Sequence, residues 1–135
     1  MTIPPSQADL LNARALPLAK LLGIEIVEAS KAGVTARLTV RDEICTAGAI
    51  LHGGAFMALA DTAGAIGAHL NLADGAQTTT IESKTNFLGG AAVGTVVTAQ
   101  ATPVHVGRRT SVWQTRITNE AGKLLALVVQ TQMAV

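Results

Sequence analysis

Hydrophobic and polar residues alternate along several short segments of the chain, which is the pattern of half-buried β-strands. The clearest run spans residues 34–40, where apolar residues take the even positions and polar residues the odd ones. A looser run spans residues 24–28, and the stretch between the two runs contains Lys31 and Gly33, as a hairpin turn would. The C-terminal half adds a series of strand candidates separated by glycine- or asparagine-containing breaks, at residues 78–87, 95–106, 110–118 and 124–134.

Residues 54–70 show a different pattern, because they are apolar on nearly every helical face and too numerous for one strand. Asp61, Thr62 and His69 are the exceptions in this segment. A helix that is apolar all round is covered by other structure. We therefore expect the predicted strands to wrap around this helix.

Two shorter helical segments are expected before the first strand. Ser6 is a suitable N-cap for a helix that runs to about Ala15. Pro17 interrupts this helix, and an apolar face then continues to Gly23, where a helix would end. The whole pattern predicts one domain over residues 1–135 with an α+β fold, an antiparallel sheet wrapped around one long central helix.

Composition narrows the class of protein. Hydrophobic residues make up 49% of the chain and charged residues only 14%, which suggests that a second subunit covers part of the surface. The net charge is +1 and the one adjacent basic pair is Arg108-Arg109, so no nucleic-acid partner is expected. Cys45 is the single cysteine, which excludes an internal disulfide. Residues 1–9 lack the pattern of a signal peptide, so we expect a cytoplasmic protein.

Residues 53–72 are apolar enough to raise the question of a membrane span. They consist largely of alanine and glycine, and Asp61 lies near their middle. An aspartate at the centre of a span costs about 2.5–3.5 kcal/mol, which such small residues do little to offset. A buried helix in a soluble core is the better interpretation, and no membrane association is expected.

Gly53 and Gly54 lie at the start of the predicted long helix. The first N–H groups of a helix have no partner within it, and glycines leave them unshielded by side chains. Such a terminus binds negative charge, including the oxyanion that develops on a carbonyl under attack. The alternative is that the two glycines only permit a tight turn into the helix.

Asp61 is the second candidate, because an aspartate in apolar surroundings is costly unless it is paired or functional. The alternative role is that its carboxylate caps the N–H groups of another segment. Gly53 and Asp61 are eight residues apart, which is about 12 Å along a helix axis. A substrate held at Gly53 is thus out of easy reach of Asp61 in the same chain. Two such helices packed antiparallel would bring the two residues together, so we expect a site shared between subunits.

Other polar residues point to less specific chemistry. His52, His69 and His105 make no metal-ligand spacing with each other or with Cys45, so no metal site is expected. His52 is expected to hydrogen-bond locally at the turn beside the glycines. A nucleophilic triad of Cys45, His52 and Asp61 has no support from their spacing.

Arg108 and Arg109 lie between two predicted strands, where they either bind phosphate groups or form a solvated turn. The chain contains no P-loop, no dinucleotide-binding fingerprint and no Gly-x-Ser-x-Gly elbow. We therefore expect no nucleotide cofactor and no serine nucleophile of that type.

The segments 52–54 and 59–63 together resemble the signature of hotdog-fold acyl-CoA thioesterases of the phenylacetic-acid-degradation (PaaI-like) type. The segments 107–110 and 119–123 are similar to the C-terminal half of the same family, and the likeness covers roughly residues 15–135. The resemblance implies a sheet curled around the long helix, homodimers joined into a continuous sheet, and usually homotetramers. It also implies an acyl-CoA substrate.

The resemblance assigns catalytic roles as well. The residue at the position of Asp61 acts as base for water or as nucleophile on the thioester carbonyl. The amide at the position of Gly53 polarises that carbonyl from the other subunit, and the residue at the position of His52 orients the site. The position six before this histidine often holds Asn or Gln, and here it is Thr46, a shorter side chain.

Two further positions follow from the same resemblance. Thr80, with Thr79 as the weaker alternative, would supply the strand hydroxyl that positions the water. Arg108 and Arg109 would lie near the phosphates of coenzyme A. The implied activity is hydrolysis of acyl-CoA to free acid and CoA. The alternatives are a hotdog hydratase of enoyl thioesters and a non-catalytic acyl-CoA binding module, and the acyl group is not readable from the residues.

Overall fold

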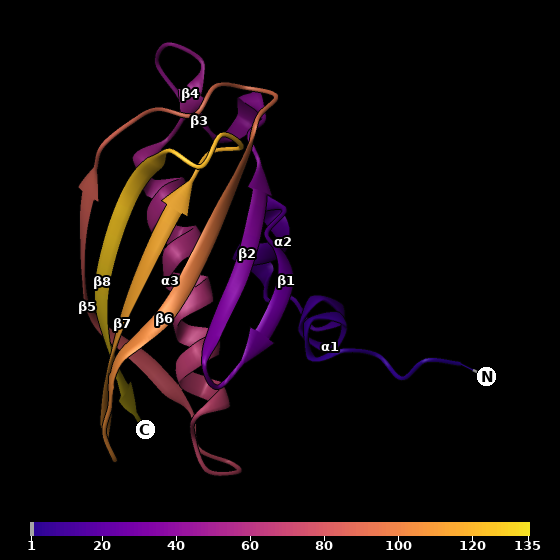
Figure 1. Cartoon of the computed structure of the whole chain (residues 1–135), viewed down its shortest axis with the longest axis vertical. Coiled ribbons are helices and arrows are strands. Elements are labelled where there is room, and N and C mark those ends of the chain that lie inside the picture. The colour runs from indigo at the N-terminus through magenta and orange to yellow at the C-terminus, as the bar shows by residue number, and fades with distance from the viewer. Residues whose placement is uncertain (1) are drawn as a thin grey trace.

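The computed structural model describes residues 2–135, and its elements follow the expected order (Figure 1). The helices are α1 (Gln7–Ala13), α2 (Pro17–Leu22) and α3 (Gly53–Leu70). The long strands are β1 (Glu25–Ser30), β2 (Gly33–Thr39), β5 (Thr78–Phe87), β6 (Val96–Val106), β7 (Thr110–Thr118) and β8 (Leu124–Ala134). A 3-10 turn (Asp42–Ile44) and a small hairpin of β3 (Cys45–Thr46) and β4 (Ile50–Leu51) connect β2 to α3.

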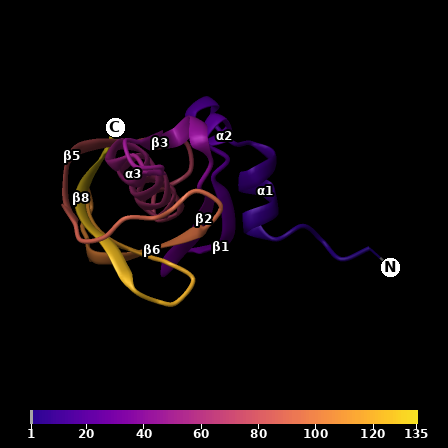
Figure 2. The same cartoon turned by 90° about the horizontal axis from the view of Figure 1, so that it is seen from above.

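The six long strands form one antiparallel sheet in the order β1-β2-β6-β7-β8-β5. Figures 1 and 2 show that this sheet curls around α3, which lies along its concave face. The strands that precede α3 in the sequence form one side of the sheet, and β5, which follows α3, forms the opposite edge. This arrangement confirms the predicted α+β hotdog fold.

The core lies between α3 and the concave face of the sheet. Trp113 and Ile117 on β7 and Leu59 on α3 have no exposed surface. A Cβ atom at Gly67 would lie only 2.5 Å from the Trp113 ring, so the glycine gives the indole room against the helix. Glycine in a helix interior lowers stability by about 1 kcal/mol relative to alanine, and this close packing is the reason for its presence here.

The N-terminal helices form where their end signals predict. The hydroxyl of Ser6 accepts from the Asp9 amide and the Asp9 carboxylate accepts from the Ser6 amide, which makes a capping box at the start of α1. This pairing lowers the pKa of Asp9. Helix α2 ends at Gly23, whose φ of 76° is the left-handed conformation that glycine adopts most easily.

Helix α1 ends at Ala13 rather than at Ala15, because Pro17 begins α2 and forces Leu16 before it into an extended conformation. The segment 41–48 contains the 3-10 turn and the short strand β3. The long helix begins at Gly53, one residue before the predicted start, because His52 serves as its N-cap.

The two edges of the sheet differ. At the β1 edge, Asn12 of α1 donates from its amide nitrogen to the Ile26 carbonyl and accepts from the Ile26 N–H, both at 2.8 Å. Helix α1 therefore satisfies backbone groups that a further strand would need (Figure 2). At the opposite edge, β5 pairs with β8 on one side and with no other strand of residues 2–135.

Within residues 2–135, no helix combines the length and the hydropathy that a membrane crossing requires.

Candidate active site

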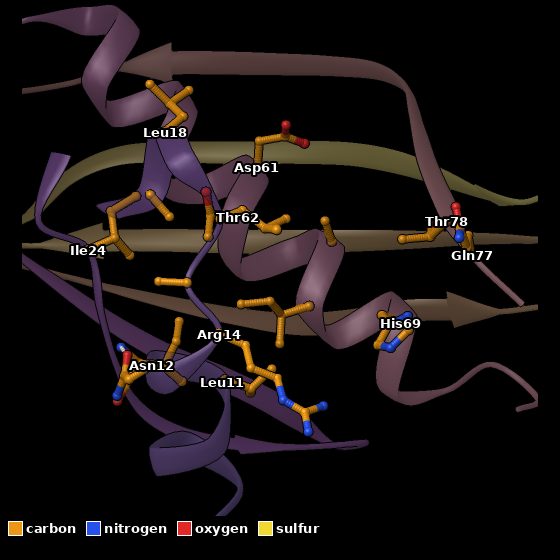
Figure 3. A pocket seen from close by; sticks show the side chains of 16 residues that line it. Leu11, Asn12, Arg14, Leu18, Ile24, Asp61, Thr62, His69, Gln77 and Thr78 are labelled. Atoms are coloured by element: carbon orange, nitrogen blue, oxygen red, sulfur yellow. Dashed lines mark hydrogen bonds between the residues drawn. The ribbon is translucent and has the colours of Figure 1, made fainter. Parts of the chain in front are cut away.

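Asp61 lies in the middle of α3 and borders a cavity of about 520 Å³. The cavity is bounded by α1, α2, β1, α3 and the start of β5, and its walls are mostly aliphatic (Figure 3). Asp61, Thr62 and His69 reach it from α3, and Leu11 from α1. A largely apolar cavity with a few polar groups and one carboxylate is a typical site for a small organic group.

One oxygen of the Asp61 carboxylate is held from two strands. Its Oδ1 accepts from the Thr80 hydroxyl at 2.6 Å and from the Gln130 side-chain amide at 2.8 Å. The Thr80 hydroxyl itself accepts from the side-chain amide nitrogen of Gln132 at 2.6 Å. The side-chain oxygen of Gln132 in turn accepts from the Thr78 hydroxyl at 2.9 Å. The donors therefore form a connected network across β5 and β8 that converges on Oδ1.

The second oxygen of Asp61 has no donor in residues 2–135, and neither oxygen accepts from a backbone N–H there. Within residues 2–135 Asp61 therefore caps no other segment's backbone, as the alternative role would require. Thr80 lies on the same partly buried face of β5 as Thr78, before a bulge between Thr80 and Glu82, and this face points toward α3. Between the two threonines considered, Thr80 is thus the one that contacts Asp61.

The N-terminus of α3 forms a second group of candidate residues. His52 caps the helix, and its Nδ1 accepts from the Gly54 amide at 2.7 Å, which confirms the expected local hydrogen bond. The Gly53 amide donates to no atom of the described residues, so it is open to an acceptor from outside. The Phe87 ring lies 3.2 Å from where a Gly53 Cβ would be. Thr46 is exposed on the hairpin β3–β4, just ahead of this terminus.

Arg108 and Arg109 form a third group, at the turn between β6 and β7 beside the C-terminal end of α3. They border a smaller cavity of about 150 Å³, and neither makes an ion pair within residues 2–135. Thr78 lines both this cavity and the larger one. The paired arginines therefore lie near one end of the cavity that holds Asp61, with their charges uncompensated.

The three groups are not joined within one chain. The structure brings Thr80 to Asp61, keeps Gly53 with His52 near Thr46, and leaves Arg108 and Arg109 at the far end of α3. Eight residues of continuous helix separate Gly53 from Asp61, about 12 Å along the axis. The distance argument from the sequence therefore holds in the folded chain.

Cys45 makes no hydrogen bond to the other candidates for a triad. Its thiol donates to the Arg41 carbonyl at 3.3 Å and contacts neither His52 nor Asp61 through a hydrogen bond. Burial of the thiol, followed by the charges of Asp42 and Glu43, raises the pKa of Cys45. A raised pKa reduces the thiolate fraction, so the environment disfavours Cys45 as a nucleophile.

Gln130 and Gln132 are the site residues that sequence reasoning missed. Both are fully or almost fully buried, and both follow Ala126 and Val128 on the core face of β8. The two glutamines occupy the positions where the alternation of β8 predicts buried apolar residues. Buried glutamines need hydrogen-bond partners, so this pattern could have indicated their part in the site. Among residues 2–135, no cluster of His, Cys, Asp and Glu side chains is suited to a metal ion.

Comparison with known proteins places this geometry in context. The family model described as thioesterase superfamily matches residues 48–126. A 1,4-dihydroxy-2-naphthoyl-CoA hydrolase of Listeria monocytogenes is 34% identical over 110 residues, covering 82% of this chain and 89% of the relative. Among solved structures, a Q49A mutant of thioesterase PA1618 from Pseudomonas aeruginosa has a TM-score of 0.89 and 29% identity, covering 99% of this chain and 96% of that one.

The PaaI protein from the phenylacetic acid degradation operon of E. coli is also similar. Its TM-score is 0.85 at 26% identity, and the match covers 96% of this chain and 91% of that chain. The resemblance read from the segments 52–54 and 59–63 is therefore confirmed at the level of family and fold.

Proposed function

The chain belongs to the thioesterase superfamily, and on that premise we propose that it hydrolyses acyl-CoA with Asp61 as its catalytic carboxylate. The observation that carries this proposal is the half-bonded carboxylate. Asp61 borders the larger cavity, two donors fix one of its oxygens, and the other oxygen has no partner in residues 2–135. A free carboxylate oxygen beside an apolar cavity is suited to act on a bound carbonyl or on a water beside it.

The chemistry needs few groups because a thiolate leaves readily. Asp61 either takes a proton from water that attacks the thioester carbon or attacks that carbon itself. The carbonyl oxygen gains negative charge as the new bond forms, and the carbon–sulfur bond then breaks to release CoA as a thiolate, which takes up a proton. If Asp61 itself attacks, the acyl group stays on its carboxylate as a mixed anhydride, which water then hydrolyses to the free acid. The unpartnered Gly53 amide at the N-terminus of α3 supplies the donor that this oxyanion requires. His52 and Thr46 would shape the same terminus.

A second copy of the chain completes the site in this proposal. Gly53 and Asp61 are too far apart along α3 to hold one thioester between them. The β5 edge of the sheet is open, whereas α1 occupies the β1 edge through Asn12. Two copies that join at β5 would set their α3 helices antiparallel, with the Gly53 of one near the Asp61 of the other. A homodimer is thus the minimal active unit, and the homotetramer stays a prediction.

The arginine pair would then bind coenzyme A. Arg108 and Arg109 lie free of ion pairs near the larger cavity, and guanidinium groups recognise phosphates through charge and forked donors. The acyl group would occupy the aliphatic cavity of about 520 Å³ beside Asp61. Its volume admits a bicyclic aromatic acid such as the one named for the Listeria relative, and also short and medium aliphatic acids.

The test is thiol release from a panel of aromatic and aliphatic acyl-CoA substrates by the wild-type chain and by Asp61→Asn. The asparagine keeps the shape of the side chain but removes its basicity, so kcat should fall about 10²- to 10⁴-fold. The thermal midpoint should stay close to that of the wild type. An unchanged rate would refute the assignment, loss of an enoyl double bond would indicate a hydratase, and tight binding without thiol release would indicate a binding module.

Sharing of the site is tested by mixing. Subunits with Asp61→Asn are refolded together with subunits that carry Gly53→Val, each inactive alone. In a two-fold dimer, half of the mixed population are heterodimers with one intact site, so about a quarter of the wild-type activity should return. No recovery in a mixture shown to contain heterodimers would place both residues in one chain's site.

A further inference from the structure

We propose that Gln130 is a positioning residue that orients Asp61, and that Gly64 is glycine in order to admit it. This inference rests on the proposed role of Asp61. Gln130 lies on β8, cross-strand from Trp113 of β7 and Ser83 of β5, and it has no exposed surface. Its side-chain amide nitrogen donates to Asp61 Oδ1 at 2.8 Å.

The rest of the Gln130 amide is not satisfied by the fold. Its Oε1 is buried and has no hydrogen-bond partner in residues 2–135. A buried polar atom without a partner lowers stability, and an apolar side chain of similar size would avoid this cost. The favourable contact of the Gln130 side chain is therefore the hydrogen bond from its amide nitrogen to Asp61.

Gly64 lies one turn after Asp61 on the same helix and faces this amide. A Cβ at position 64 would lie 2.3 Å from the Gln130 Oε1 and 2.7 Å from its Cδ. Gln130 is fully buried, so it has no solvent into which it could move. Glycine is unfavourable in a helix interior, and at this position it leaves the space in which Gln130 reaches Asp61.

Both donors to Asp61 approach the same oxygen. The Thr80 hydroxyl and the Gln130 amide meet at Oδ1 from β5 and β8, which fixes the rotation of the carboxyl group. The remaining oxygen is then held in one direction without being blocked. Preorganisation of this kind keeps a reacting atom in its productive position without a cost at the moment of reaction.

The experiment begins with Gln130→Met, which keeps the length and volume of the side chain and removes the donor. The kcat for the best acyl-CoA of the panel should fall about ten- to hundredfold because the carboxylate is no longer fixed, while KM changes little. Gly64→Ala should act in the same direction, because its methyl group displaces the amide.

Gly67→Ala is the matched control. It adds the same methyl group one turn further along α3, 2.5 Å from the buried Trp113 ring, at a position without a hydrogen-bond link to Asp61. It should lower the thermal midpoint and leave kcat close to that of the wild type. In a Gln130→Ala background the methyl group has room, so Gly64→Ala should cause no further loss of kcat.

Two results would overturn the proposal. One is a Gln130→Met enzyme with wild-type kcat, and the other is losses of kcat at positions 64 and 130 that simply multiply. Should the wild-type chain cleave no thioester, the proposed function fails, but the carbon-13 spectrum of the Asp61 carboxyl still tests the contact. Its resonance should move in Gln130→Met and stay in place in Gly67→Ala, and an unmoved resonance in Gln130→Met would contradict the role of Gln130.

Discussion

Helix α3 contains two pairs of glycines, and the absence of a side chain has a different purpose in each pair. Gly53 and Gly54 at its N-terminus keep side chains away from the backbone, so an amide stays open. At Gly64 and Gly67 in its interior, the space that a Cβ would occupy is taken by the Gln130 amide and the Trp113 ring. Glycine in a helix thus marks an open binding group in one place and a tightly packed neighbour in the other. The neighbours of the missing Cβ, rather than the residue type, distinguish the two.

Gly53→Val should have the largest effect, because its side chain blocks the open backbone amide of Gly53. A branched side chain at this position meets the Phe87 ring, 3.2 Å from the Cβ site, and crowds the free amide. Loss of one oxyanion donor typically lowers kcat about 10²- to 10³-fold. Phe87 is half-exposed and can move aside, so the unfolding free energy should change little.

Thiol-release kinetics and a denaturant titration measure these two quantities on the same sample. Wild-type kcat in a folded Gly53→Val enzyme would mean that the open amide has no part in catalysis.

Gly67→Ala should have the next largest effect, and on stability rather than on chemistry. Overpacking of a full core costs about 1–3 kcal/mol, and the better helix propensity of alanine returns about 1 kcal/mol. Trp113 is fully buried and cannot yield easily, so a net loss of up to about 2 kcal/mol is expected. Urea titration gives the value. A more stable variant would show that the packing around the indole is loose.

Gly54→Ala should have the smallest effect. A Cβ at this position lies 3.0 Å from the His52 Nδ1, which now accepts from the Gly54 amide. The imidazole has to turn, and the amide loses a bond worth about 1 kcal/mol, which the gain in helix propensity offsets. We expect a fewfold loss of kcat at nearly constant stability. Steady-state kinetics next to Gly53→Val tests whether the two glycines differ as described.

Local patterns in the sequence predict most of the fold, and of the candidate site they single out Gly53 and Asp61. The alternation in residues 34–40 and the length of the apolar run at 54–70 predict their elements because both are set by neighbours along the chain. The same is true of the spacing between Gly53 and Asp61, which a helix turns directly into a distance.

What the sequence left out depends on contacts between distant segments. Gln130 lies 69 residues from Asp61, and only the register of β8 against β5 brings its amide to that carboxylate. The reason for the interior glycines Gly64 and Gly67 is likewise a side chain on another element. Thr80 was found through the family resemblance, since its contact with Asp61 joins two different elements and has no plain signal in the residues.

The two hydrogen bonds between Asn12 and Ile26 have a consequence for self-association. A sheet with two unpaired edge strands could add further copies at both edges, as aggregating strands do. Helix α1 already covers the β1 edge, so in the proposed dimer pairing through β5 would stop at two copies. Asn12→Ala would leave the Ile26 N–H and carbonyl at this edge without their partners, so it should make association beyond the dimer easier.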